Sequence, residues 1–154
     1  MAFAAIALFV VLADQLSKVW IQANLAVGQI SFDAGFFQII HVQNTGAAFG
    51  IFKEHTSAII VLVFIEIAII LLIVFLLRNR LSFLDGKLVR VGLGLIIGGA
   101  IGNQIDRLRL GYVTDFLDFK VWPAFNVADS SAVVGAIVIA FAILFLAKSA
   151  GQRE

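Results

Sequence analysis

Four long apolar stretches dominate this chain and restrict what it can fold into. They run over about 2–24, 57–77, 88–107 and 129–148, and each approaches the roughly 20 residues that a helix needs to cross a bilayer. Hydrophobic residues make up 62% of the sequence, and a typical soluble domain has only about 45–50%. We therefore expect an all-α membrane protein with four transmembrane helices in a single integral membrane domain, 1–154.

The polar stretch 29–52 is too broken to span the membrane. Apolar and polar residues alternate from Ile39 to Asn44, a pattern typical of short strands, and Asn44-Thr45-Gly46 then forms a turn sequence. We expect a small β-sheet lobe here, outside the membrane, between the first and second helices.

Charge and cysteine content exclude several classes of protein. The net charge is only +1, so the chain has no basic field for binding nucleic acid. The sequence contains no cysteine, which excludes disulfides, a thiolate nucleophile and a cysteine-based metal site.

The distribution of basic residues predicts how the chain is oriented in the membrane. Six basic residues lie in the link 78–90 and the tail 148–154, whereas the two opposite links hold three. Because basic residues accumulate on the cytoplasmic side, both termini are expected in the cytoplasm. The lobe would then lie at the outer face, together with Asp106, Asp115 and Asp129.

Several charged residues fall within the predicted spans. Asp14 and Lys18 are four residues apart and can pair on one helix face. The pair fits two interpretations: an ion pair that reaches the interface beside Trp20, or a support for a functional site. Glu66 lies in the middle of the second span, where we expect it to be protonated or paired, with proton relay as the alternative.

Small residues recur on the third span. Gly94, Gly98 and Gly102 are spaced by four, which forms a ridge that another helix can approach closely. The motifs GxGxxG and GxxxxGK[ST] are absent, so a nucleotide-binding loop is not favoured.

The acids near the outer end of the third span differ in their neighbours. Asp106 shares a helix face with Asn103 and Arg107, which suits an ionised structural support. If 113–121 is extended, Asp118 and Lys120 share one side and form an exposed pair.

On the other side of that extended segment, Asp115 falls with apolar residues, which should raise its pKa. Asp129 begins the last helix, where the helix dipole favours a carboxylate. One protonated acid and one ionised acid are what a water-activating pair requires. The alternative is that Asp129 only caps the helix and Asp115 is a satisfied loop acid.

At these residues the sequence resembles the prolipoprotein signal peptidases, the type II signal peptidases of bacteria. Five blocks carry the resemblance and cover nearly the whole chain in order. The blocks are Asp14-Gln15-Leu16-Ser17-Lys18, Asn44-Thr45-Gly46-Ala47-Ala48-Phe49, Gly102-Asn103-Gln104-Ile105-Asp106-Arg107, Val113-Thr114-Asp115-Phe116 and Phe125-Asn126-Val127-Ala128-Asp129.

The resemblance implies an aspartic endopeptidase that removes the signal peptide of a diacylglyceryl-modified prolipoprotein, cutting before the lipidated cysteine. Asp115 and Asp129 would be catalytic. Residues of the same blocks would bind substrate or support the site: Asp14, Lys18, Asn44, Gly46, Asn103, Asp106, Arg107 and Asn126. The resemblance further implies a monomer in the bacterial cytoplasmic membrane, in contact with its lipids, with an active site near the outer face and no metal or organic cofactor. A substrate helix could approach the glycine ridge through the lipid.

Two other classes of function compete with this interpretation. A small proton- or ion-coupled transporter would use Glu66, Asp14 and Asp115 as relay groups. The clustering of acids at one face and the lack of repeated halves disfavour it. A non-catalytic assembly or anchor protein would use the acids only as structural supports.

Overall fold

The computed structural model describes residues 2–46 and 86–150, together with residues 60, 61, 63–65, 67–69 and 72. The predicted second span, 57–77, lies largely outside the described residues, and so does Glu66. The helices and strands, in chain order, are α1 (Ala2–Asn24), β1 (Ile30–Asp33), β2 (Gln38–Asn44), α3 (Lys87–Leu110), β3 (Val113–Asp118) and α4 (Val127–Ala150).

Three helices in the described part of the chain are long and apolar enough to cross a membrane, over 3–24, 87–110 and 127–144. Their outward faces carry large apolar side chains. Phe9 of α1 and Leu144 of α4, for example, are each 71% exposed. A soluble protein rarely exposes so much apolar surface, whereas a lipid environment favours it.

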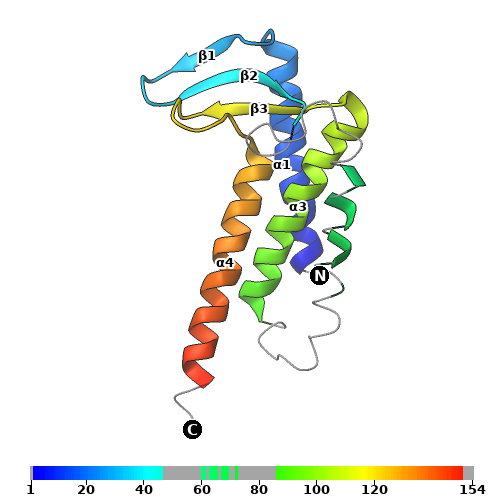
Figure 1. Cartoon of the computed structure of the whole chain (residues 1–154), viewed down its shortest axis with the longest axis vertical. Helices are drawn as coiled ribbons and strands as arrows, with labels where there is room; N and C mark the ends of the chain where they lie inside the picture. The colour runs from blue at the N-terminus through cyan, green and yellow to red at the C-terminus, as the bar shows by residue number, and fades with distance from the viewer. Residues whose placement is uncertain are drawn as a thin grey trace.

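The helices stand side by side, and the sheet lies across one end of them (Figure 1). α3 packs against both α1 and α4. The N-terminal end of α1 and the C-terminal end of α4 both lie away from the sheet. The sheet and the connection from α3 through β3 to α4 therefore lie at the same end of the bundle.

The glycines of α3 allow this close packing. A Cβ on Gly98 would lie 2.8 Å from the Ala7 carbonyl oxygen of α1, and one on Gly102 would lie 2.6 Å from the Asp14 carboxylate. The predicted ridge therefore allows close approach, but α1 occupies it. The idea that a substrate helix approaches this ridge is wrong for that reason.

The sheet has three antiparallel strands in the order β1-β2-β3. The predicted lobe supplies β1 and β2, whereas β3 comes from the connection between α3 and α4. Gly111 ends α3 in the left-handed conformation, with φ 79°, so the chain reverses sharply into β3. Asp115 is thereby placed opposite Val42, and Val113 opposite Asn44.

The exposed ion pair of the lobe differs from the prediction. Lys120 pairs with Asp33, with 2.7 Å between Nζ and Oδ1. Asp118 instead accepts the backbone N–H of Lys120 at 2.7 Å and the side-chain amide of Gln38 at 2.6 Å. The expected Asp118–Lys120 ion pair is wrong because Lys120 adopts a positive φ of 61° and leaves the extended geometry on which that pairing depended.

Candidate active site

The first candidate acid, Asp115, is a buried side chain of β3. Only 2% of it is exposed. Its carboxylate accepts hydrogen bonds from the side-chain amides of Asn44, at 2.9 Å, and Asn126, at 2.7 Å. Burial raises the pKa of the Asp115 carboxyl from its ordinary 3.8 to about 7. The hydrogen bond from Asn44 opposes the increase in pKa, and the charge of Asp129 adds to it. The direction agrees with the prediction, and the group can hold or release a proton near neutral pH.

The second candidate acid, Asp129, lies in the first turn of α4. Its backbone N–H donates to Asn126 Oδ1 at 3.0 Å, and the Asn126 backbone N–H donates to its carboxylate at 3.2 Å. This reciprocal arrangement is a variant of the capping box, with Asn126 as the cap. The prediction that Asp129 begins the helix is wrong, because α4 begins at Val127.

Two asparagine side chains connect the acids. Asn126 Nδ2, which donates to Asp115, also donates to Asn103 Oδ1 at 3.0 Å. Asn103 Nδ2 donates to Asp129 Oδ1 at 2.7 Å. Both acids line one cavity of about 310 Å³. Its walls also include Asn44, Asn103, Arg107, Val113, Ala132, Val133 and the stretch Trp122-Pro123-Ala124-Phe125.

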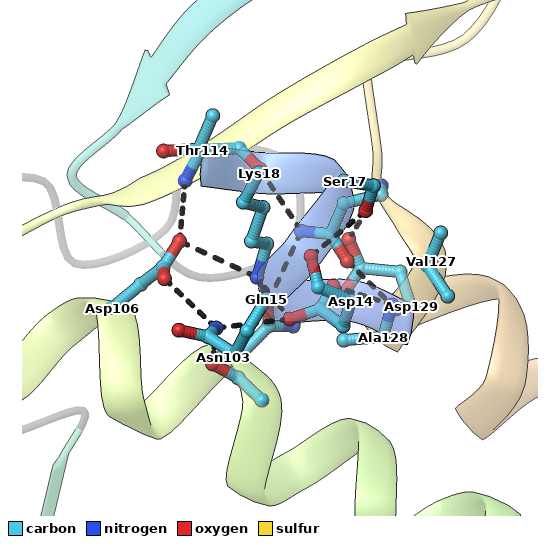
Figure 2. Close-up of polar contacts among 12 residues, drawn as sticks. Asp14, Gln15, Ser17, Lys18, Asn103, Asp106, Thr114, Val127, Ala128 and Asp129 are labelled. Carbon is cyan, nitrogen blue, oxygen red and sulfur yellow. Dashed lines mark hydrogen bonds and ion pairs between the residues drawn. The ribbon is translucent and has the colours of Figure 1, made fainter. Parts of the chain in front are cut away.

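A buried ion cluster joins α1 to α3 next to Asn103 (Figure 2). Lys18 Nζ lies 2.8 Å from Asp14 Oδ2 and 3.3 Å from Asp106 Oδ2. The same ammonium donates to Asn103 Oδ1 at 2.8 Å. The predicted Asp14–Lys18 pair is confirmed. Its interpretation as an interfacial pair is wrong, because Lys18 is 1% exposed and Asp14 0%.

Asp14 also ties α1 to the beginning of α4. Its Oδ1 accepts the backbone N–H of Ala128 at 2.9 Å, one of the free donors in the first turn of that helix. The room for this carboxylate exists because Gly102 carries no side chain beneath it. Asp14 therefore fixes the helix turn from which Asp129 projects.

Asp106 is held by groups that the sequence did not single out. Its carboxylate accepts the backbone N–H of Thr114 at 3.0 Å and the side-chain amide of Gln15 at 3.1 Å. A structural role for Asp106 fits this geometry. Its ion-pair partner is Lys18, whereas the prediction was a neighbouring arginine. Thr114 and Gln15 are next to predicted site residues, and both lie in the sequence blocks that carry the family resemblance.

Arg107 and Gly46 connect α3 to the end of β2. Arg107 Nη2 donates to the Gly46 carbonyl oxygen at 3.4 Å, and the Gly46 N–H donates to Asn44 Oδ1 at 3.0 Å. The Arg107 guanidinium lines the cavity and interacts electrostatically with Asp115 and Asp129. All ten predicted site residues thus belong to one continuous network of polar contacts.

The cavity wall formed by the β3–α4 connection was missed by sequence reasoning. Trp122 is 58% exposed yet lines the cavity, and Phe125 stacks on Phe119 with ring centroids 5.9 Å apart. No pattern in the sequence indicated this stretch beyond Phe125 itself, which lies in a matching block. Within the described ranges, no three His, Asp or Glu side chains gather in a group that could hold a metal ion.

Solved structures with a similar fold give the class of the protein. A bacterial membrane enzyme solved in meso at 2.3 Å resolution matches with a TM-score of 0.80 and 31% identity, covering 99% of this chain and 91% of that one. A second, solved at 1.9 Å, matches with a TM-score of 0.73 and 33% identity over 92% of each chain. The fold is therefore that of a bacterial membrane enzyme.

Sequence comparisons give the family. Residues 6–145 match the family model of signal peptidase (SPase) II. The lipoprotein signal peptidase of Dehalococcoides mccartyi is 48% identical over 144 residues, 94% of this chain and 89% of the relative. That of Moorella thermoacetica is 40% identical over 154 residues, 99% of each chain. The chain belongs to the signal peptidase II family of membrane proteases.

Proposed function

We propose that this chain removes the signal peptide from diacylglyceryl-modified bacterial prolipoproteins by cutting before the lipidated cysteine. Family membership supports the substrate class. The observation that carries the chemistry is that Asp115 and Asp129, from different elements, line one cavity and are linked through the same two amides. The cavity is lined by residues of α3 and α4 and of strands β2 and β3, so it lies where apolar helices meet the sheet, which suits a substrate with a lipid-bound part and an extended peptide.

In the proposed reaction, Asp129 acts first as the base. Its ionised carboxylate takes a proton from a water molecule, whose oxygen attacks the carbonyl carbon of the scissile peptide bond. Asp115 begins protonated, because its burial disfavours the charged form, and donates to the carbonyl oxygen. Asp129 then gives its proton to the leaving nitrogen while the ionised Asp115 takes a proton back from one hydroxyl of the tetrahedral intermediate, and the C–N bond breaks to leave an amine and a new carboxyl group. The two acids share their protons as a pair throughout the cycle.

The neighbouring polar groups position the acids and the peptide. Asn44 and Asn126 donate to Asp115, so its carboxyl cannot rotate freely. Arg107 supplies a fixed positive charge beside the cavity, which favours the negative charge that develops on the carbonyl oxygen as water attacks. The segment around the scissile bond must be extended, because a helix engages its own carbonyl groups.

The proposed location is the bacterial cytoplasmic membrane, with both termini in the cytoplasm and the active site near the outer face. The positive-inside pattern supports this orientation. Because one chain supplies both acids, a monomer is sufficient for the reaction. The mechanism requires no metal or organic cofactor.

Reconstitution tests the proposed function. The purified chain in lipid vesicles is mixed with a preprotein that carries diacylglyceryl on its cysteine, or with the same preprotein without lipid. We expect a mobility shift on a gel for the lipidated form only, a product that begins with the modified cysteine, and no effect of a metal chelator. The proposal fails if neither form is cut, or if cleavage occurs elsewhere; loss of turnover restored by added metal would reject the metal-free mechanism.

A further inference from the structure

Asn103 stands between the Lys18 cluster and the candidate acids, and one orientation of its amide satisfies both sides. Its oxygen accepts from Lys18 Nζ at 2.8 Å, and its nitrogen donates to Asp129 Oδ1 at 2.7 Å. An ammonium group can only donate, and an ionised carboxylate can only accept. Rotation of the amide by half a turn would place an N–H against the ammonium and an oxygen against the carboxylate.

The orientation of Asn126 depends on that of Asn103. Because Asn103 presents its oxygen, Asn126 must present its side-chain nitrogen, at 3.0 Å. The same nitrogen donates to Asp115 Oδ1 at 2.7 Å. A chain of directed hydrogen bonds therefore starts at Lys18 and reaches both acids through two amides.

Asp129 alone does not hold this orientation throughout the proposed reaction. When its carboxyl group gains a proton, the resulting O–H can donate, and a rotated Asn103 amide can accept it. Lys18 lies on the opposite side of Asn103 and presents a donor to the amide oxygen in either state of Asp129. Lys18 is 1% exposed, so water does not compete readily for this bond.

We propose that Lys18 is a positioning residue. It fixes the Asn103 amide so that the N–H points at Asp129, and it thereby keeps both carboxyl groups oriented for activation of water. The inference rests on the proposed proteolytic function. It assigns Lys18 a role in turnover beyond its ion pair with Asp14.

Charges from several elements act on this part of the site. They are Asp14 on α1, Asp106 and Arg107 on α3, and Asp115 on β3. Replacing Lys18 changes the local charge as well as the hydrogen bond to Asn103. Loss of the Lys18 charge and loss of the Lys18–Asn103 hydrogen bond would each favour protonation of Asp129, the proposed base. The experiment must therefore separate these two causes.

The test is the pH dependence of kcat/KM on a lipidated preprotein. On the acidic side of the profile (the acidic limb), kcat/KM falls as Asp129 gains a proton. For Lys18→Met we expect the midpoint of this fall to lie about one pH unit higher, a tenfold change in proton concentration, as one hydrogen bond to a charged group can produce. We also expect kcat to fall with KM nearly unchanged, because the interaction orients reacting groups and not the substrate. Lys18→Arg retains a donor and should shift the limb less.

A double-mutant cycle separates the bond from the charge. In an Asn103→Ala background, Lys18→Met should shift the acidic limb no further. An equal shift in both backgrounds would show that Lys18 acts by its charge alone, and would overturn the proposal. A fall in melting temperature with an unmoved limb would also overturn it, because Lys18 would then be a structural ion pair.

Two further variants keep the result interpretable. Lys18→Met combined with Asp14→Asn removes one charge of each sign, and serves if the single variant fails to fold. Gln15→Met is the matched control, since Gln15 bonds the same two acids, Asp14 at 3.2 Å and Asp106 at 3.1 Å. Gln15→Met should lower the melting temperature and leave the midpoint of the acidic limb of kcat/KM unchanged. If Gln15→Met shifts that midpoint as much as Lys18→Met does, the proposal is wrong. Absence of cleavage by the unmodified enzyme would instead reject the proposed function.

Discussion

At the scale of single residues, the two candidate acids have different surroundings. Asp115 is buried on β3, and the loss of contact with water raises its pKa. Asp129 lies in the first turn of α4, where its carboxylate accepts the Asn126 backbone N–H and the Asn103 side-chain amide. In the proposed reaction, this difference between surroundings suits Asp115 to the role of proton donor and Asp129 to that of proton acceptor.

The pKa of Asp115 leads to a prediction about pH. Because its pKa is raised to about 7, the group loses its proton as pH rises through that region. If protonated Asp115 donates to the scissile carbonyl, kcat/KM falls on the alkaline side with a midpoint near that value. Initial rates on a lipidated preprotein between acidic and alkaline pH measure this limb. A profile that stays flat through neutral pH and into the alkaline range would contradict the assignment.

Sequence reasoning succeeded at residue scale where the cause was local. Alternation along one strand is enough to predict that the pKa of Asp115 is raised, and its burial on β3 raises it. The role of Asn126 was not predictable in the same way, because a cap is defined by where the helix begins. The start of α4 at Val127 makes Asn126 the cap and gives its side chain contacts to Asp115, Asp129 and Asn103.

At the scale of elements, α3 organises the molecule. It packs against α1 and α4 and carries Asn103, Asp106 and Arg107 at the end nearest the sheet. Close packing along α3 depends on glycines, since added Cβ atoms would meet the neighbouring helices. The position of the site therefore depends on helix packing as well as on its own hydrogen bonds.

Two glycine substitutions separate packing from site geometry. Gly98→Ala and Gly102→Ala should each destabilise the fold by about 1–3 kcal/mol, the usual cost of overpacking. Only Gly102→Ala pushes on the Asp14 carboxylate, so it should also lower the cleavage rate. Thermal melting in detergent and cleavage below the melting temperature measure the two effects. Equal losses of activity in both variants would contradict the idea that Gly102 is needed specifically to leave room for the Asp14 carboxylate.

The elements differ in how far their sequence predicts them. Long apolar runs mark α1, α3 and α4 directly, because a membrane helix is recognisable from its own residues. The pairing of β3 with β2 was not predicted, since it joins segments far apart in the chain. For the same reason the glycine spacing predicted a close contact but not its partner, α1.

At the scale of the whole molecule, the site lies at one end of the bundle beneath the sheet. The N-terminal end of α1 and the C-terminal end of α4 lie away from it. This arrangement agrees with a bilayer that separates the chain ends from the sheet. The distribution of basic residues predicts that the sheet faces the outside of the cell.

Cysteine labelling measures the orientation, because the chain contains no cysteine of its own. We expect Phe36→Cys, at a side chain that is 72% exposed on the lobe, to react with an impermeant maleimide in intact spheroplasts. Gln152→Cys, in the tail, should react only after permeabilisation. The reverse pattern would place the site on the cytoplasmic side and contradict the proposed orientation.

The central claim is that Asp115 and Asp129 together activate the water that cuts the peptide bond. Asp115→Asn and Asp129→Asn keep the size of each side chain and remove its acid, so each should lower the cleavage rate by roughly 10²–10⁴-fold or more. Asp33→Asn, at an exposed acid of the same sheet, is the matched control and should cleave at the normal rate. If either single variant cleaves a lipidated preprotein normally while folded in the membrane, the account of the site is wrong.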